Sequence, residues 1–362
     1  MGQEPAIRRP AIFGVGDYWA ERLREAPLDP LPTAVPAAAG RSLDERAAQL
    51  LAAVTARHRG RQLGDVYQLT DTDTPEGACR TVRTGEPDAP PEVLDPGQAR
   101  QQLAAALELV WGVGPWHAEA LRSQGIRTLQ DLAGHPRFGA EAGRLWRAVA
   151  AEDPAAAFFA VRRRVGASDP LLWETRALFD PEGFLFVDIE TLGFSGVAAI
   201  LIGVAEWEGG QLSICQYVAE SVGDEPALLA ALAQHAAGKA ALVTYNGLSF
   251  DVAMLAARAA YYGLPRPLAA LPHYDLVHFA RRVWRDRLPD CQAVTIEREV
   301  LGIERPDDLP GAYVPPFYEA YQQEGEVGPL TYIIDHNRWD LVGLARIFTR
   351  LSADAWGAGR VR

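Results

Sequence analysis

The clearest hydrophobic pattern lies in the second half of the chain. Three apolar runs there have the length and the β-branched or aromatic content of strands: FLFVDIE (184–190), AAILIGVAEWE (198–208) and QLSICQYV (211–218). Gly209-Gly210 joins the last two runs, which predicts a tight hairpin. The pattern therefore predicts three strands that follow one another as a meander.

Helices and short strands alternate after this meander. Helical spacing predicts helices at about 225–237 and 250–262, with a strand at 241–246 between them. HYDLV (273–277) is typical of another strand or strand end, and the rest is mostly helical. This order of elements predicts an α/β protein with a mixed sheet flanked by helices, and it resembles a ribonuclease H-like fold.

The first half of the chain is broken by two proline-rich stretches, 26–40 and 84–97, which are typical of linkers or long loops. Between them lies a predicted helix with Ser42 and Glu45 as a capping box. A helical pattern runs from Gln98 to about Ala151. We therefore predict three parts: an N-terminal region (1–97), a helical domain (98–177) and a ribonuclease H-like domain (178–362).

Composition limits the classes of protein. Hydrophobic residues make up 48% and charged residues 23%, as in globular proteins. The longest apolar stretch, Val197 to Ala205, is too short to cross a bilayer, and MGQEPAIRRP lacks the apolar core of a signal peptide. Three cysteines lie far apart. We expect a cytoplasmic protein without a membrane partner, and the net charge of −12 argues against binding nucleic acid by bulk charge alone.

Two acids interrupt the first predicted strand. Asp188 and Glu190 are two residues apart, so their side chains leave the same face of the strand. Two neighbouring carboxylates are costly to bury unless a cation or strong donors offset their charge. The alternative is a strand end at which both acids reach water. Thr191-Leu192-Gly193 follows, so the pair lies at the carboxyl end of the strand, where sites on such sheets gather.

Further candidates come from two predicted helices. Asp251, in YNGLSFD, begins a helix after the strand that ends at Asn246, a position at which an aspartate is also favoured as a helix cap. His336 and Asp340, in HNRWD, are four residues apart and share one helical face, which Leu344 continues toward the core. A salt bridge within the helix is the alternative for this pair.

The chemistry of phosphodiester cleavage explains why such residues would gather. Two divalent ions about 3.5–4 Å apart can hold a scissile phosphate, activate water and stabilise the leaving 3′ oxygen. Mg²⁺ and Mn²⁺ prefer carboxylate oxygens, and four acids offset their charge. A histidine with a reference pKa near 6.5 can accept a proton at neutral pH.

Three motifs together resemble a known family. DIET, YNGLSFD and HNRWD resemble the exonuclease motifs of the DEDD superfamily of 3′→5′ exonucleases, and 184–351 resembles the ribonuclease H-like domain of the YprB type. By position, the resemblance implies that Asp188, Glu190, Asp251 and Asp340 bind two Mg²⁺ or Mn²⁺ ions and that His336 is the general base. One departure is the four-residue spacing from His336 to Asp340, because the histidine subclass usually has five.

Other residues receive supporting or weaker assignments. Asp275, in HYDLV, occupies a place where the superfamily often has another aspartate, and we expect it to support the site rather than to catalyse. Asn246 is a candidate nucleic-acid contact. The arginines of RRVWRDR (281–287) and RRR (162–164) are candidate phosphate contacts, with a solvated helical face as the alternative for the first group.

The helical domain carries a second signal. WGVGPWHAEALRSQGIRTLQDLAGHP (111–136) resembles a helix–hairpin–helix element. Gly112 and Gly114 permit a tight turn whose backbone N–H groups, near the start of the next helix, can hold a DNA phosphate. A scaffold turn without a ligand is the alternative.

Together these features predict a 3′→5′ exonuclease acting on DNA, either single-stranded or at 3′ ends. The expected reaction is in-line attack of water on the terminal phosphodiester, with release of nucleoside 5′-monophosphates. Alternatives are an RNA exonuclease of the same chemistry, an enzyme that cuts hybrids internally, and a nucleic-acid binding module with weak catalysis. Only the helix–hairpin–helix signal favours DNA, because nothing in the motifs reads the sugar 2′-OH.

Overall fold

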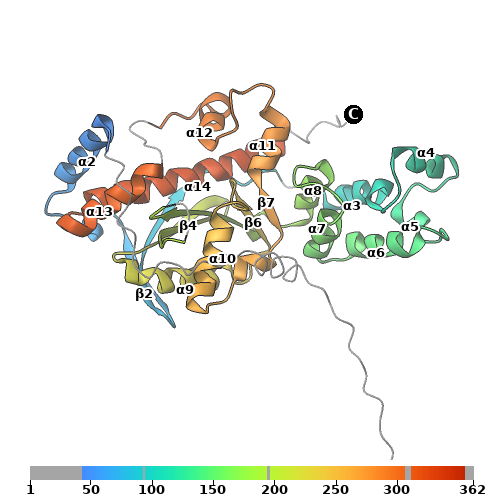
Figure 1. Cartoon of the computed structure of the whole chain (residues 1–362). Helices are drawn as coiled ribbons and strands as arrows, with labels where there is room; N and C mark the ends of the chain where they lie inside the picture. The colour runs from blue at the N-terminus through green and yellow to red at the C-terminus, as the bar shows by residue number, and fades with distance from the viewer. Residues whose placement is uncertain (1–42, 93, 194–195, 306–310, 355–362) are drawn as a thin grey trace, which may run out of the picture. The chain divides into compact units, whose positions relative to one another are not determined.

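A seven-stranded mixed sheet forms the centre of the structure (Figure 1). The computed structural model describes residues 43–92, 94–193, 196–305 and 311–354. The strand order is β1-β2-β5-β4-β3-β6-β7. The strands are β1 (Leu69–Thr74), β2 (Gly77–Glu86), β3 (Phe184–Thr191), β4 (Ala199–Glu208), β5 (Gln211–Val218), β6 (Ala241–Thr244) and β7 (His273–Asp275).

The three predicted strands β3, β4 and β5 form an antiparallel meander, and β6 and β7 continue it in parallel with β3. Gly209 and Gly210 both have positive φ, at 57° and 81°, as the hairpin between β4 and β5 requires. The segment 273–277 divides, because β7 ends at Asp275 and a helix begins at Leu276. The mixed sheet with its helices confirms the predicted α/β fold class.

Two strands were not anticipated from the sequence. β1 and β2 form a hairpin that pairs antiparallel with β5, placing Arg80 opposite Val218 and Thr84 opposite Ile214. The expected linker at 84–97 is therefore wrong at both ends: β2 extends to Glu86, and the next helix begins at Pro96. The other proline-rich stretch, 26–40, lies outside the described residues.

The helices begin and end as follows: α2 (Glu45–His58), α3 (Pro96–Ala105), α4 (Pro115–Ser123), α5 (Leu129–Leu132), α6 (Gly139–Ala150), α7 (Pro154–Arg162), α8 (Pro170–Glu174), α9 (Glu225–Ala236), α10 (Asp251–Tyr262), α11 (Leu276–Trp284), α12 (Ala293–Ile296), α13 (Val314–Glu324) and α14 (Gly328–Asp354). At α2, Asp44 is the N-cap and accepts a hydrogen bond from the Ala47 N–H, whereas the expected cap, Ser42, lies outside the described residues. Among the helices of the described ranges, none combines the length and the apolar character that crossing a membrane requires.

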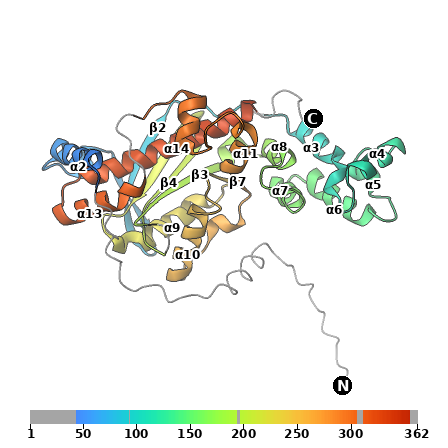
Figure 2. The ribbon, with the colours of Figure 1, turned by 45° about the horizontal axis from the view of Figure 1, so that its top comes forward.

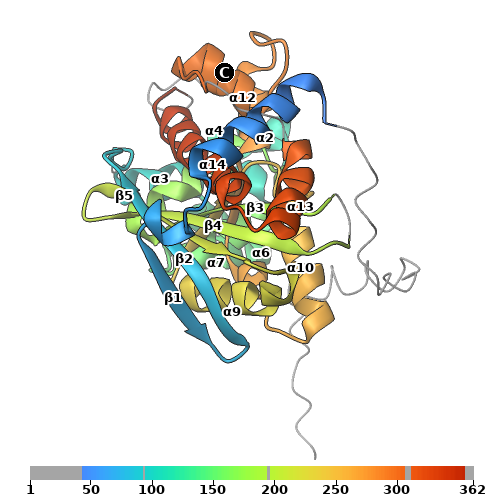
Figure 3. The same cartoon turned by 90° about the vertical axis from the view of Figure 1, so that its left-hand side faces the viewer.

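Helices cover both faces of the sheet (Figure 3). α9 and α10 lie on one face. Leu185 and Val187 of β3 are buried in a core that includes Leu228 of α9 and Leu255 of α10. The long helix α14 crosses the other face, together with α13 and α2. Phe184 and Phe186 of β3 meet Phe348 of α14 at ring-centroid distances of 5.0 and 5.6 Å. Alternate β3 residues therefore face α14, and this face carries the candidate site.

Helices α3 to α8 form the helical part that precedes β3 (Figure 2). Its apolar side chains share one core with the sheet, because Trp173 lies 4.6 Å from Phe279 and 5.4 Å from Phe348 between ring centroids. Thr175 and Tyr274 also share a buried hydrogen bond of 2.7 Å. All described residues belong to one compact unit, and the domain boundaries near 97 and 177 stay predictions.

Candidate active site

The predicted carboxylate pair lies on the β3 face that is covered by α14. Asp188 and Glu190 continue the row of Phe184 and Phe186, as the two-residue period of a strand requires. Glu190 is buried, and Asp188 is partly exposed. The register of the β3–β4 pairing shifts between Glu190 and Thr191, so the regular ladder ends directly after the two acids. The alternative, in which both acids simply reach water, does not hold for Glu190 because its side chain is buried.

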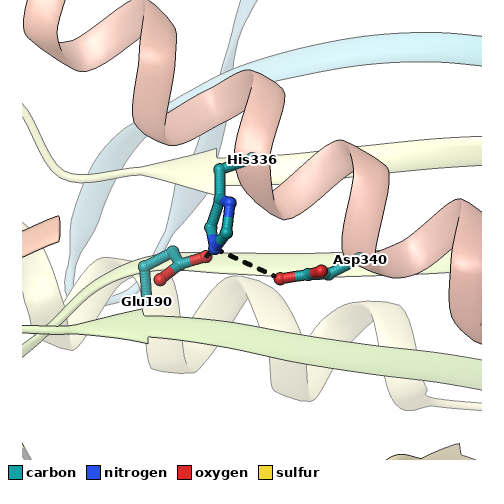
Figure 4. A group of neighbouring side chains, drawn as sticks. All are labelled: Glu190, His336 and Asp340. Atoms are coloured by element: carbon teal, nitrogen blue, oxygen red, sulfur yellow. Dashed lines mark ion pairs between the residues drawn. The ribbon is translucent and has the colours of Figure 1, made fainter. Parts of the chain in front are cut away.

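α14 brings the predicted histidine and aspartate to this pair. His336 Nε2 lies 3.5 Å from Asp340 Oδ2 and 4.0 Å from Glu190 Oε1 (Figure 4). One ligand atom from each of these three residues lies within 4.8 Å of the others, close enough to hold a metal ion together. The helical pair expected from the four-residue spacing does form, and β3 adds a third member to it. The same face of α14 continues into the core through Leu344 and Phe348.

Asp251 is the first residue of α10, and its buried carboxylate reaches back to β3. Its Oδ1 accepts a hydrogen bond of 3.3 Å from the N–H of Ile189, the residue between the two β3 acids. Burial raises the pKa of Asp251 to about 7, although its backbone hydrogen bonds oppose this shift. The negative charges of Asp275 and Asp340 add to the rise. The N-cap of α10 is Phe250, so Asp251 does not serve as the helix cap and is instead a neighbour of the β3 pair in space.

The carboxyl group of Asp188 is also strongly perturbed. Burial raises its pKa well above the usual range, and the negative charges of Asp340, Asp251 and Glu190 raise it further. A hydrogen bond of 2.8 Å from Asn337 Nδ2 to Asp188 Oδ2 opposes this effect. Such crowding of carboxylates is costly in the absence of a compensating cation, so the donor set fits hard divalent ions such as Mg²⁺ or Mn²⁺.

Asn337 connects the sheet to α14 and was not recognised in the sequence. It is fully buried, and its Oδ1 accepts a hydrogen bond of 2.9 Å from Gln216 Nε2 of β5. Gly203 makes this contact possible, because a Cβ atom there would lie 2.0 Å from Asn337 Oδ1. Gln216, Gly203 and Asp188 are neighbours across three strands. The only sequence signal for Asn337 is its place on the inward face of HNRWD, three residues before Asp340.

A buried arginine holds the outer side of Asp340. Arg305 Nη1 donates to Asp340 Oδ1 at 2.6 Å, and its Nη2 donates to Glu297 Oε1 at 2.6 Å. Glu297 begins a π-helical turn (Glu297–Leu301) and lies against α14 at Gly343, where a Cβ atom would be 1.8 Å from Glu297 Oε1. Arg305 thus fixes the direction of Asp340, and sequence spacing gave no signal for it.

Asp275 supports the loop between β6 and α10 rather than reaching the cluster. It is the N-cap of α11, and its carboxylate accepts hydrogen bonds from the N–H groups of Asn246 at 2.6 Å and Leu248 at 3.0 Å. Asn246 has a φ of 65°, the sole positive value at a non-glycine residue in the described part. Gly247 follows, where a Cβ atom would lie 2.4 Å from Thr244 Oγ1. This turn sets where α10, and with it Asp251, begins.

The candidate phosphate contacts lie elsewhere. Gly112, with a φ of 84°, forms a turn before α4, and Gly114 is the N-cap of that helix without a side-chain hydrogen bond. The arginines at 281, 282, 285 and 287 are exposed; the first two lie on α11 and the other two follow its end at Trp284. In the 162–164 group, Arg164 pairs with Glu141. Nucleic-acid binding by Gly112, Gly114 and Asn246 stays a prediction.

Comparison with known proteins defines the class of the second half of the chain. Residues 185–352 match the family model of the RNase_H superfamily, so this segment is an RNase H-like domain. Over 179 residues the chain is 30% identical to the uncharacterized protein YprB of Bacillus subtilis (strain 168). That match covers 48% of this chain and 43% of YprB, so the chain spans less than half the length of this relative.

Proposed function

We propose that this chain is a metal-dependent 3′→5′ exonuclease that hydrolyses terminal phosphodiester bonds of DNA and releases nucleoside 5′-monophosphates. The observation that carries the proposal is the meeting of Glu190, His336 and Asp340 beside the crowded carboxyl groups of Asp188 and Asp251. An RNase H-like domain supports nucleic-acid hydrolysis in general terms. The direction of digestion and the preference for DNA are the finer parts of the proposal.

The four carboxylates would hold two Mg²⁺ or Mn²⁺ ions. When bound, such ions neutralise charge on the phosphate and make the attacking water more acidic. The fit is supported by the raised pKa values of Asp188 and Asp251, because a nearby cation would favour their charged forms. Asn337 and the Ile189 N–H would keep one oxygen of each of these two carboxylates oriented.

His336 would accept the proton of the attacking water at Nε2. This atom lies within 4.0 Å of the carboxylates of both Glu190 and Asp340, which would stabilise the imidazolium that forms. The four-residue spacing of this pair is compatible with the role, because one helical turn already directs both side chains to the same point (Figure 4).

DNA is the proposed substrate because of the turn at Gly112 and Gly114. The first N–H groups of α4 lack a side-chain cap and could hold a phosphate. Asn246 would contact the nucleic acid near the start of α10. Hydrolysis of RNA by the same residues is the nearest alternative, and a cytoplasmic location is part of the proposal.

The test uses a 5′-labelled single-stranded DNA and its RNA counterpart with Mg²⁺ or Mn²⁺. Wild-type protein is compared with Asp188→Ala, and products are resolved by length. We expect a descending ladder on DNA from the wild type and none from the variant. A ladder on RNA alone would favour the RNA exonuclease, and early internal products would favour an endonuclease. Retained binding without cleavage would support a binding module.

A further inference from the structure

Two indole side chains are unusually exposed beside the turn at Gly112. Trp111 is 79% exposed and Trp116 is 77% exposed, the largest exposed fractions among the large hydrophobic residues of the described part. Trp111 precedes Gly112, and Trp116 lies in the first turn of α4. Exposing an indole forgoes the stabilisation that its burial would give. We call these two side chains the indole surface.

Other rings extend the indole surface along one side. The Trp116 ring meets His117 edge to face at 5.0 Å, and His117 lies 6.4 Å from Phe138. The Arg137 guanidinium lies 4.9 Å from the centre of the Phe138 ring. Aromatic planes and a cation therefore stand next to one another around a turn made of glycines.

The charge of this part of the chain differs from the rest. Residues 98–177 contain ten arginines and eight acidic residues, whereas the remaining chain has 25 basic and 39 acidic residues. The helical part thus has a net positive charge in a strongly acidic protein. This balance favours an anionic partner, and a nucleic-acid strand is a polyanion.

The surroundings also argue against a protein partner. A stable protein interface buries about 800 Å² on each side around an apolar centre. Here the neighbours of the indoles in the chain are Gly112, Gly114 and Pro115, and the nearby Glu108 and Arg122 form an exposed ion pair at 3.0 Å. Two separate flat rings among small and charged residues suit bases better than an apolar protein core.

We propose that Trp111 and Trp116 form a stacking surface for the unpaired bases of single-stranded nucleic acid. Every base has a flat face, so such stacking holds a strand without reading its sequence. The indole surface would select strands with unpaired bases over closed duplexes, whose bases are already stacked. This inference rests on the proposed nuclease function, which it deepens by naming the form of the substrate.

The test measures binding and hydrolysis separately. Binding of labelled oligothymidylate, its RNA counterpart and a blunt duplex is followed by fluorescence anisotropy with a chelator present, which prevents cleavage. The variants are Trp111→Ala/Trp116→Ala, Trp111→Phe/Trp116→Phe and, as a matched control, Tyr261→Ala, an aromatic residue 54% exposed on another helix. Hydrolysis of the p-nitrophenyl ester of thymidine 5′-monophosphate, which has a single base, reports the active site.

We expect the double alanine variant to bind both single strands at least about tenfold more weakly, since each stacked base accounts for a factor of about 5 to 150. The phenylalanine pair and Tyr261→Ala should stay close to wild type, and ester hydrolysis should not change. Unaltered binding by the alanine pair, or an equal loss on the blunt duplex, would overturn the inference. So would dissociation of a self-associated form by the alanine pair, which would mark a protein contact. Failure of the wild type to cleave the ester, with strand binding still dependent on the indoles, would count against the nuclease function alone.

Discussion

Gly203 tests how the candidate site is held together. It lies opposite Asp188 in the sheet and beneath α14. In Gly203→Ala, the new Cβ atom would lie 2.0 Å from Asn337 Oδ1 and 2.8 Å from Leu341 Cδ1, so either Asn337 or the whole of α14 must move. Overpacking of this kind costs about 1–3 kcal/mol of unfolding free energy. A shift of about 1 Å between reacting groups costs about 100-fold in rate.

The measurement combines urea unfolding with phosphodiester hydrolysis. Gly85→Ala is the matched control, because its Cβ atom on β2 would lie 3.7 Å from the Leu212 carbonyl oxygen, an ordinary contact. We expect the control to keep near wild-type activity, and Gly203→Ala to lose both stability and rate. The double variant Gly203→Ala/Asn337→Ala should regain part of the stability because the clash with the Asn337 side chain is gone, whereas the contact with Leu341 remains. Its rate should stay low because Asp188 has lost its donor.

The double variant also gives the sharpest refutation. If the losses from Gly203→Ala and Asn337→Ala were simply additive, the two residues would not be in contact. Wild-type hydrolysis by Gly203→Ala would contradict the view that Asn337 and α14 set the geometry of the cluster.

Three further predictions concern the buried charges. First, burial opposes the charge of His235, but contacts with Cys215 and Glu206 raise the pKa of His235 to about 9. Burial also opposes the charge of Glu206, but contacts with His235 and Lys239 lower the pKa of Glu206 to about 2. The stabilisation from His235 is complete below its ordinary pKa of 6.5 and is lost as the pH rises to 9; that from Glu206 is complete above 4.5 and is lost as the pH falls to 2. The loss of unfolding free energy in Glu206→Gln should therefore be largest between pH 4.5 and 6.5 in urea titrations, and a pH-independent difference would contradict this. Second, Arg258→Leu removes the partner of the fully buried Glu225 and should cost about 3–5 kcal/mol in urea unfolding, whereas a loss below about 1 kcal/mol would refute the pairing. Third, Arg305→Lys cannot keep both 2.6 Å hydrogen bonds and should raise the Mn²⁺ concentration for half-maximal hydrolysis about 10- to 100-fold, and an unchanged value would remove Arg305 from the support of Asp340.

Local patterns were sufficient to predict much of the sheet. β3, β4 and β5 are continuous apolar runs because both faces of the sheet are covered, and Gly209-Gly210 marks the hairpin between β4 and β5. The hairpin of β1 and β2 was missed because β1 reads LTDTDT, with polar residues on both faces of an edge strand. Its pairing with β5 is a contact between distant segments that no local pattern specifies.

The candidate site divides in a similar way. The two-residue period of a strand places Asp188 with Glu190, and the helical period joins His336 to Asp340 while directing Asp335 away, where it accepts a hydrogen bond from Tyr67. The groups that hold these side chains were not predictable. Asn337 depends on the space above Gly203, and Arg305 reaches Asp340 from a different segment of the chain.

The central claim is that the cluster of carboxylates between β3 and α14 is required for hydrolysis. Two aspartates of α14 test this claim most directly. Asp340→Asn alters the cluster that contains His336, whereas Asp335→Asn alters a carboxylate of α14 that accepts a hydrogen bond from Tyr67 instead. The rate of digestion of a 5′-labelled single strand with Mn²⁺ is measured for both. The account predicts a loss of more than about 100-fold for Asp340→Asn and a rate within about twofold of wild type for Asp335→Asn. Equal rates for the two variants would contradict it.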